Sequence, residues 1–275
     1  MSTHTIGIAT AGRPRRDPEP AARQPVSEPL FELRGVGKTF GSGTVALEGL
    51  DFAVGRHAFV SLLGPSGCGK STVLRLIAGL LRPSRGRLIW HRRIARGDIG
   101  FVFQEPTLMP WASVFDNVRL PLKLQGRPRR EVREEVERAL SMVGLEDFAG
   151  AYPRELSGGM KMRVSIARAL VTRPELLLMD EPFAALDEIT RFKLNNELLN
   201  LWARESWTVV FVTHSVYESV YLSERILVMA SRPGRITGEI PIEVPYPRDE
   251  AFRLSSRYTA ACRRVSDELR RAMGE

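Results

Sequence analysis

The sequence predicts an α/β fold, in which helices cover a mainly parallel sheet. Short and wholly apolar runs recur at residues 59–63, 176–179, 208–212 and 226–229, as expected for buried parallel strands. Segments with helical spacing of apolar residues lie between these runs. Strands that alternate with helices favour a parallel sheet with crossover connections.

Length and composition limit the possible classes of protein. The chain has 275 residues, 43% of them hydrophobic, which suits one globular unit with a subdomain. No apolar run approaches the roughly 18 residues that span a bilayer, and no secretory segment opens the chain, so we expect a cytosolic protein. Its two cysteines predict neither a disulfide framework nor a metal site. We interpret the net charge of +8 mainly as solvated surface, with weak attraction to anionic lipid as the alternative.

The N-terminal part of the chain is expected to contain strands. Residues 1–28 are rich in Pro and Arg without an apolar period, which predicts a disordered leader. Residues 31–33 alternate like an edge strand, and residues 45–54 are consistent with further antiparallel strands. Two more strands are expected at residues 87–90 and 99–103.

Helices are expected in the remaining segments. The insert from about 105 to 160 is predicted to be mainly helical, with one helix that starts near Pro128 and stops at Gly144. A second helix is expected at residues 157–171. Residues 246–275 predict an amphipathic C-terminal helix, and we favour a helix that caps the domain over a separate regulatory module.

One glycine-rich segment has the pattern of a phosphate cradle. Residues 64–72 match G-x-x-x-x-G-K-[ST] and lie between an apolar strand and a helix, which is the setting that this motif requires. Converging backbone N–H groups and the helix dipole bind an anion there. Lys70 can reach the β- and γ-phosphates of a nucleotide, and Ser71 can offer its hydroxyl to Mg²⁺. The predicted nucleotide-binding residues are Gly64, Pro65, Ser66, Gly67, Cys68, Gly69, Lys70, Ser71 and Thr72, with Cys68 as a small filler rather than a redox residue.

Two carboxylates follow the apolar run at 176–179. Asp180, at the strand end, can hold Mg²⁺ through water, because Mg²⁺ keeps several of its waters. Glu181 can accept a proton from a water that attacks the γ-phosphate. Taken alone, such an acidic pair is also common on the protein surface at the end of a strand. Its presence beside a phosphate loop in one α/β domain favours the functional interpretation.

The helix expected at 157–171 begins with a second candidate phosphate contact. Ser157 fits an N-cap, and Gly158 and Gly159 leave the helix end open to an anion, although an ordinary cap would look the same. The order of the phosphate loop, Gln104, Leu-Ser-Gly-Gly-Met, Leu-Leu-Leu-Met-Asp-Glu-Pro and then His214 resembles the nucleotide-binding subunits of ABC transporters over residues 29–240. The resemblance implies a P-loop ABC cassette with a RecA-like core, an antiparallel β subdomain and a helical subdomain at about 105–160, all within an ATP-binding domain at 29–245.

The resemblance also implies roles for single residues. Phe40 would stack on adenine, where a core phenylalanine is the alternative. Gln104 would contact Mg²⁺ or the attacking water, and His214 would act as the switch at the γ-phosphate. Without the resemblance they would be a polar loop residue and a structural histidine. Residues 184–187 would form the D-loop, which passes signals across a dimer.

Partners follow from the same resemblance. Two copies would enclose two ATP molecules, with the phosphate loop of one copy facing the other copy's helix end at Ser157, Gly158, Gly159 and Met160. Hydrolysis of ATP to ADP and phosphate would be coupled to transport through integral-membrane permease subunits, and indirectly to an extracytoplasmic substrate-binding protein. The expected location is peripheral, at the cytoplasmic face of the bacterial plasma membrane, with no nucleic-acid partner.

Residues 102–111, 182–187 and 213–219 resemble the importer subfamily for nitrate, taurine and alkanesulfonates. Lys161-Met162-Arg163 departs from the Arg-Gln-Arg of many members, and some relatives with that form are linked to thiamine-precursor pyrimidines, so the cargo stays open. Residues 108–111 form an apolar stretch, which predicts a groove for a permease helix over a local core turn.

Two other functions remain to be weighed. A soluble ABC ATPase acting on the ribosome or nucleic acid is the main alternative, but such relatives usually have two cassettes or a coiled-coil insertion, and the sequence has one cassette and no sustained heptads. A nucleotide kinase could use the same phosphate loop, but it gives no reason for the Ser157-Gly158-Gly159 helix end.

Overall fold

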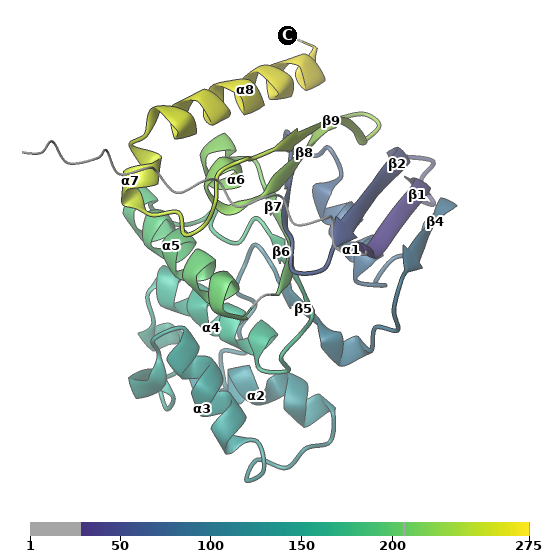
Figure 1. The fold of residues 1–275 in the computed structure, drawn as a ribbon. Coiled ribbons are helices and arrows are strands. Elements are labelled where there is room, and N and C mark those ends of the chain that lie inside the picture. The colour runs from purple at the N-terminus through teal and green to yellow at the C-terminus, as the bar shows by residue number, and fades with distance from the viewer. Residues whose placement is uncertain (1–28, 206, 275) are drawn as a thin grey trace, which may run out of the picture.

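The computed structural model describes residues 29–205 and 207–274 (Figure 1). The predicted leader at residues 1–28 lies outside the described residues. Within them, one large sheet lies at the centre, a small sheet stands on one side of it, and helices cover the rest (Figure 1). No helix in this part of the chain combines the length and the apolar character needed to cross a membrane.

The large sheet contains the predicted parallel strands. Its order is β5-β6-β7-β3-β8-β9, and the first five strands pair in parallel while β9 pairs antiparallel to β8. All four apolar runs that predicted buried strands are confirmed. The strands are β3 (Phe59–Leu63), β5 (Ile99–Val102), β6 (Leu176–Asp180), β7 (Thr208–Thr213), β8 (Arg225–Ala230) and β9 (Arg235–Pro241).

This sheet is apolar on both faces because each face belongs to a different core. Phe59 and Leu63 of β3 join one cluster of buried side chains, whereas Val60 and Leu62 between them join the other. Successive side chains of a strand point to opposite faces, so a strand buried on both sides needs an unbroken apolar run. This explains why the sequence of these strands does not alternate.

The small sheet has the order β2-β1-β4 and is antiparallel, formed by β1 (Pro29–Thr39), β2 (Val45–Gly55) and β4 (Arg85–Trp90). The prediction of an edge strand at residues 31–33 was wrong, because Phe31 pairs with Val54 on one side and with Trp90 on the other. A central antiparallel strand also alternates when one of its faces is solvated. Residues 45–54 form one strand with register shifts, rather than several strands.

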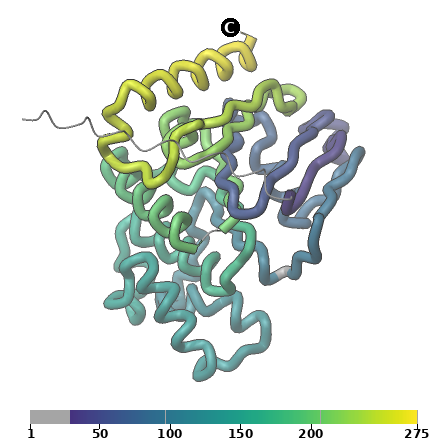
Figure 2. Tube along the Cα trace, viewed as in Figure 1, coloured from purple at the N-terminus to yellow at the C-terminus, as the bar shows by residue number. Residues whose placement is uncertain are grey.

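Helices cover each face of the large sheet. α1 (Lys70–Ile77) packs with the small sheet in one core. The other core is covered by α4 (Gly158–Leu170), α5 (Glu188–Glu205), α6 (Val216–Leu222) and α8 (Ser256–Met273). In Figure 2 the green and yellow parts of the tube, which include α5, α6 and α8, lie together on that side.

The insert is helical, as predicted, and contains α2 (Val114–Leu124) and α3 (Arg133–Met142). The predicted helix start near Pro128 was wrong. The amide of Glu131 donates a 3.1 Å hydrogen bond to the carbonyl of Pro128, so this stretch first makes a turn and the helix begins at Arg133. At α2, Ser113 acts as N-cap for the amide of Asp116.

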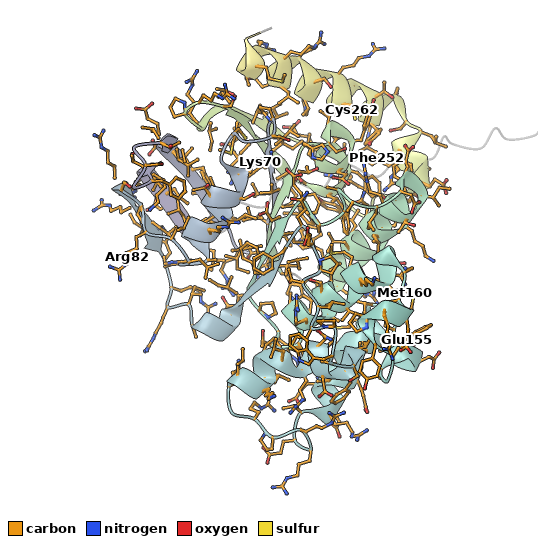
Figure 3. The ribbon with its side chains drawn as sticks, turned by 180° about the vertical axis from the view of Figure 1, so that it is seen from behind. Lys70, Arg82, Glu155, Met160, Phe252 and Cys262 are labelled. Carbon is orange, nitrogen blue, oxygen red and sulfur yellow. The ribbon has the colours of Figure 1, made fainter. Side chains whose placement is uncertain are left out.

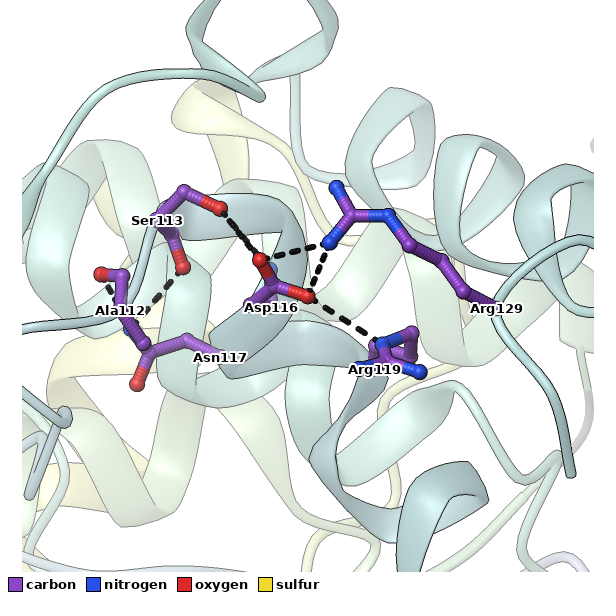
Figure 4. A network of polar contacts seen from close by, with 6 residues as sticks. All are labelled: Ala112, Ser113, Asp116, Asn117, Arg119 and Arg129. Carbon is purple, nitrogen blue, oxygen red and sulfur yellow. Dashed lines mark hydrogen bonds and ion pairs between the residues drawn. The ribbon is translucent and has the colours of Figure 1, made fainter. Parts of the chain in front are cut away.

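A polar network holds the start of α2 in place (Figure 4). The Asp116 carboxylate accepts hydrogen bonds from Ser113 Oγ at 3.2 Å, Arg119 Nε at 3.2 Å and Arg129 Nη1 at 2.6 Å. Arg129 lies in the turn before α3. The network therefore fixes that turn against α2.

The C-terminal segment forms two helices, α7 (Glu250–Arg253) and α8, where the sequence predicted one. The buried Arg248 joins this segment to the end of α6, because its guanidinium donates to the carbonyls of Val220, Tyr221 and Ser223 at 2.9–3.0 Å. Tyr258, Ala261, Cys262 and Val265 of α8 are buried, and Figure 3 places Cys262 and Phe252 in this region. These contacts favour the prediction of a capping helix.

Candidate functional site

The candidate site forms where three neighbouring parallel strands end. β6, β7 and β3 are adjacent in the sheet, so their carboxyl ends lie at one edge. Asp180 ends β6, His214 follows β7, and the loop of residues 64–69 follows β3. Ligands of open α/β sheets bind outside this edge.

The loop of residues 64–69 has no room for a side chain at either of its two ends. Gly69, the N-cap of α1, has φ 95°, which L-residues rarely adopt. A Cβ on Gly64 would lie 2.6 Å from the carbonyl oxygen of Met229 and 2.8 Å from Cys68 Sγ. Burial raises the pKa of the Cys68 thiol, which suits a filler rather than a reactive residue. Glycine at Gly64 and Gly69 thus allows the loop to pass close to neighbouring backbone and side chains.

Lys70 lies at the start of α1 and is almost fully buried, with 4% of its surface exposed. Its ammonium donates hydrogen bonds to the carbonyls of Gly64 at 2.8 Å and Pro65 at 3.0 Å. Nζ also lies 3.4 Å from Glu181 Oε1. The loop therefore curls around the lysine, and the ammonium is shared with the predicted general base.

Glu181 has φ 45°, in the left-handed region that non-glycine residues seldom enter. Its amide donates a 3.0 Å hydrogen bond to the carbonyl of Val212 on β7, which holds this conformation. The carboxylate lies between Lys70 and His214, since Oε2 is 3.0 Å from His214 Nδ1. Such strained residues concentrate at active sites.

Ser71 and Asp180 form the second pair in the site. Ser71 Oγ donates a 2.9 Å hydrogen bond to Asp180 Oδ1, although the two residues are far apart in the sequence. Burial raises the pKa of Asp180. A hydroxyl and a carboxylate on neighbouring elements are the hard oxygen ligands that Mg²⁺ prefers, so the residues fit a magnesium ion that also keeps waters.

Two predicted residues lie outside this cluster. Gln104 is exposed, two residues after β5 ends, and no hydrogen bond among the described residues joins it to Ser71 or Asp180. Phe40 is 38% exposed at the turn between β1 and β2, with Lys38 Nζ 5.5 Å from its ring centre. Phe40 is therefore not a core residue. This argues against a core phenylalanine, which was the alternative to stacking on adenine.

The helix end at Ser157 lies apart from the phosphate loop. Ser157 is the N-cap of α4, as predicted, and its Oγ accepts a 3.2 Å hydrogen bond from the amide of Met160. Figure 3 places Lys70 and Met160 in different parts of the molecule. Within the described residues, no hydrogen bond or ion pair joins residues 157–160 to residues 64–72. The two candidate phosphate contacts do not meet in one chain.

Sequence reasoning missed a network behind His214. Thr213 Oγ1 donates a 2.5 Å hydrogen bond to Oε2 of the buried Glu218 and accepts a 3.0 Å hydrogen bond from the amide of Ser215. Arg191 Nη2 donates to the carbonyl of Leu186 at 3.1 Å, and its Nε lies 3.6 Å from Glu218 Oε1. The network joins the His214 loop to residues 184–187. Its one signal in the sequence is the capping-box pattern of Ser215 and Glu218.

Comparisons with known proteins agree on one family. A family profile described as ABC transporter matches residues 47–184. A putative ATP-binding protein of Brucella abortus is 47% identical over 241 residues, which cover 86% of this chain and 92% of that protein. The aliphatic sulfonates import ATP-binding protein SsuB 1 of Pseudomonas syringae is 47% identical over 233 residues and covers 85% of this chain and 94% of its own. The taurine import ATP-binding protein TauB of Rhizobium johnstonii is 46% identical over 207 residues, with 74% and 79% covered.

Solved structures show the same fold. The structure of cbiO1 from Clostridium perfringens, part of an ABC transporter complex, has a TM-score of 0.72 and 28% identity, and covers 89% of this chain and 97% of that one. A dimeric structure of the bacterial ABC transporter cassette MJ0796 has a TM-score of 0.68 and 35% identity, and covers 78% and 100%. A second structure of that cassette is a post-hydrolysis state bound to ADP and phosphate.

These findings confirm the predicted P-loop ABC cassette and favour a transporter ATPase over a soluble ATPase acting on the ribosome or nucleic acid. The family profile spans half of the chain, and relatives of nearly half identity span most of it. The chain therefore belongs to the ABC transporter family, as a subunit that binds and hydrolyses ATP.

Proposed function

We propose that this chain is the ATPase of a membrane importer and that it works as a homodimer around two ATP molecules. The observation that carries this proposal is the linked set of Lys70, Glu181 and His214 beside the Ser71–Asp180 pair. A cation, a base, a histidine and a pair of oxygen ligands at one strand edge are the parts that phosphate cleavage requires.

In the proposed mechanism, the oxygens of the triphosphate compete with Glu181 for the ammonium of Lys70. The Glu181 carboxylate accepts a proton from the attacking water, and His214, 3.0 Å from that carboxylate, orients it toward the γ-phosphate. When bound, Mg²⁺ neutralises charge on the phosphates, and Ser71 and Asp180 would hold it. Gln104 would join the site from the segment after β5, and Phe40 offers its exposed ring to adenine.

Homodimerisation would complete the site. The helix end at Ser157 is exposed and carries the positive end of the α4 dipole, which suits the phosphate of a second copy. Its separation from Lys70 within one chain supports an arrangement in which each copy supplies one half. The relative MJ0796, a dimeric cassette, gives independent support.

A surface beside α2 is proposed to receive the permease. Trp111 is 77% exposed, at a turn that Asn117 holds through hydrogen bonds with Met109, Ala112 and Ser113, the last two of which Figure 4 shows. Phe103, Thr107 and Leu124 line a cavity of about 700 Å³ with α4, and Trp111 is not among its lining residues. An anchored, exposed aromatic and an apolar cavity on the surface around α2 suit a short permease helix, whereas a core turn would bury Trp111. Docking there would hold the subunit peripherally at the cytoplasmic face of the membrane.

For the cargo, we propose a small organic acid of the sulfonate or taurine class, taken up through a permease and an extracytoplasmic binding protein. The names of the relatives SsuB 1 and TauB support this class. The departure at Lys161-Met162-Arg163 bears less on the cargo than the sequence suggested, because Met162 is 2% exposed and packs in the core. A pyrimidine cargo stays the alternative.

The test of this proposal is the Glu181→Gln variant. Loss of the general base should lower the rate of ATP hydrolysis by at least about 100-fold, whereas ATP affinity should persist because Lys70 and the loop remain. Glu239→Gln, on an exposed carboxylate of β9, is the matched control and should hydrolyse ATP normally. Normal turnover in Glu181→Gln would refute the role of Glu181.

A further inference from the structure

Glu181 and His214 lie on two loops that leave neighbouring strands. The loop of residues 181–187 follows β6, and His214 lies in the short connection between β7 and α6. The side chain of His214 is 50% exposed, so packing does little to hold it. The 3.0 Å contact between Glu181 and His214 therefore depends on how the backbones of the two loops are fixed.

A buried ion pair stands behind these loops. Arg191 lies in the first turn of α5, and its Nε is 3.6 Å from Oε1 of Glu218 on α6. Glu218 is 7% exposed. Taking two charges out of water can cost more than their attraction returns, so a buried pair does little for stability compared with apolar packing. Its position beside the site points instead to a role in fixing conformation.

Each partner of the pair also holds one of the loops. Arg191 Nη2 donates a 3.1 Å hydrogen bond to the carbonyl of Leu186, near the end of the loop that begins at Glu181. Glu218 Oε2 accepts the hydrogen bond of Thr213 Oγ1 at 2.5 Å. One charged link thus joins the two loops at the end away from the sheet.

The link reaches His214 through the hydroxyl of Thr213. This oxygen also accepts a 3.0 Å hydrogen bond from the amide of Ser215, which closes a turn around His214. A hydroxyl has one proton and two lone pairs, so donation to Glu218 orients it to accept from Ser215. Holding Glu218 in place therefore holds the Thr213 hydroxyl, and that hydroxyl sets the backbone of His214.

We propose that Arg191 and Glu218 are positioning residues for ATP hydrolysis, which hold the His214 loop against the Glu181 loop. This deepens the function proposed above and rests on the roles given there to His214 and Glu181. The phosphate loop takes no part in these contacts. The rate of the chemical step should therefore depend on the ion pair, whereas the affinity for ATP should not.

Glu218→Gln tests the proposal on the full chain. It keeps the size of the side chain and an acceptor for Thr213, but it removes the charge that pairs with Arg191. We expect kcat for ATP hydrolysis to fall at least about tenfold, while KM for ATP stays within about twofold. An unchanged kcat, or a KM that rises by as much as kcat falls, would overturn the proposal.

The ion pair of Arg163 with Glu197 supplies the matched control. It joins α4 to α5 at 2.6 Å, and burial raises the pKa of Glu197 as it raises that of Glu218. Glu197→Gln thus breaks a partly buried pair of α5 that does not touch Leu186 or Thr213, and it should keep kcat within about twofold of the wild type. An equal fall of kcat in both variants would show a general effect of losing such a pair and would reject the positioning role.

Thr213 gives a second test, which holds even if Glu218→Gln folds poorly. Thr213→Val removes the hydroxyl at nearly constant shape and should lower kcat as Glu218→Gln does. Thr213→Ser keeps the hydroxyl and should retain most of the wild-type rate. Equal rates in the two variants, whether high or low, would show that the hydroxyl does not carry the link and would contradict the proposal.

A measurement without turnover separates this proposal from the function on which it rests. The chain has four histidines, and comparison with His214→Ala identifies the ring signals of His214 by NMR. Those signals should shift in Glu218→Gln and stay in place in Glu197→Gln, because only the first change releases the His214 loop. Unshifted signals in Glu218→Gln would overturn the positioning role even if kcat falls. Failure of the proposed function would be seen separately, as normal turnover in Glu181→Gln.

Discussion

Glu181 combines a rare backbone angle with two charged neighbours. The left-handed conformation costs about 1–3 kcal/mol, and the hydrogen bond to Val212 helps to hold it. If Glu181 continued strand β6 in an extended conformation, its side chain would point in another direction. The strain thus places the carboxylate beside Lys70 and His214, where the proposed chemistry needs it.

Lys70 gives the first prediction at this scale. Lys70→Ala should weaken ATP binding about ten- to hundredfold, because hydrogen bonds to charged groups contribute about 1.5–3 kcal/mol each. Nucleotide affinity is measured by calorimetry. Lys123→Ala, an exposed lysine at the end of α2, is the control and should bind as the wild type does. Tight binding in Lys70→Ala would count against the phosphate-loop assignment.

The sequence predicted the features that contiguous residues form, but it did not predict contacts between residues far apart in the chain. Lys70 and Ser71 belong to one short motif whose physics is local, and the spacing of the apolar runs predicted the strands. The ion pair of Lys70 with Glu181 and the hydrogen bond of Ser71 to Asp180 depend on how strands order in the sheet, which no local pattern encodes. For the same reason, alternation in residues 31–33 did not distinguish a central strand from an edge.

Among the elements, α6 connects the site to the C-terminal segment. Ser215 caps its start beside His214, and Arg248 bonds three carbonyls at its end. Arginine is suited to this position because its planar fork offers several donors while staying charged. The short helix is thus fixed at both ends, which limits how far His214 can drift.

Arg248→Ala is the prediction that belongs to this element. It leaves at least three buried carbonyls without a donor, and each such loss costs about 1–3 kcal/mol, so the free energy of unfolding should fall by more than about 3 kcal/mol. Urea denaturation measures this loss. Arg257→Ala, on the exposed side of α8, should change stability by less than about 0.5 kcal/mol. Similar stability of both variants would show that the Arg248 contacts contribute little.

The whole molecule presents two separated phosphate-binding candidates on one body. Both cores meet at the large sheet, so β3 is tied to helices on either face. A body tied together in this way resists internal rearrangement, so under the proposed function a second copy joins the two half-sites.

Assembly gives the prediction at this scale. Glu181→Gln with Mg²⁺-ATP should form a dimer in size-exclusion chromatography with light scattering, because the shared triphosphate is not cleaved. With ADP the same variant should elute as a monomer. Adding Gly158→Arg, whose Cβ would lie an ordinary 3.5 Å from Leu186 and whose long side chain would cover the exposed start of α4, should prevent the dimer. A Glu181→Gln protein that stays monomeric with Mg²⁺-ATP, alone and with its membrane partner, would refute the paired arrangement.

The ammonium that Lys70 shares between its loop and Glu181 has a consequence for timing. One positive charge cannot neutralise a carboxylate and a triphosphate equally at once. Binding of ATP to Lys70 and release of Glu181 from Lys70 are then a single exchange of partners. Under the proposed roles, Glu181 becomes free to act as a base only when ATP is bound.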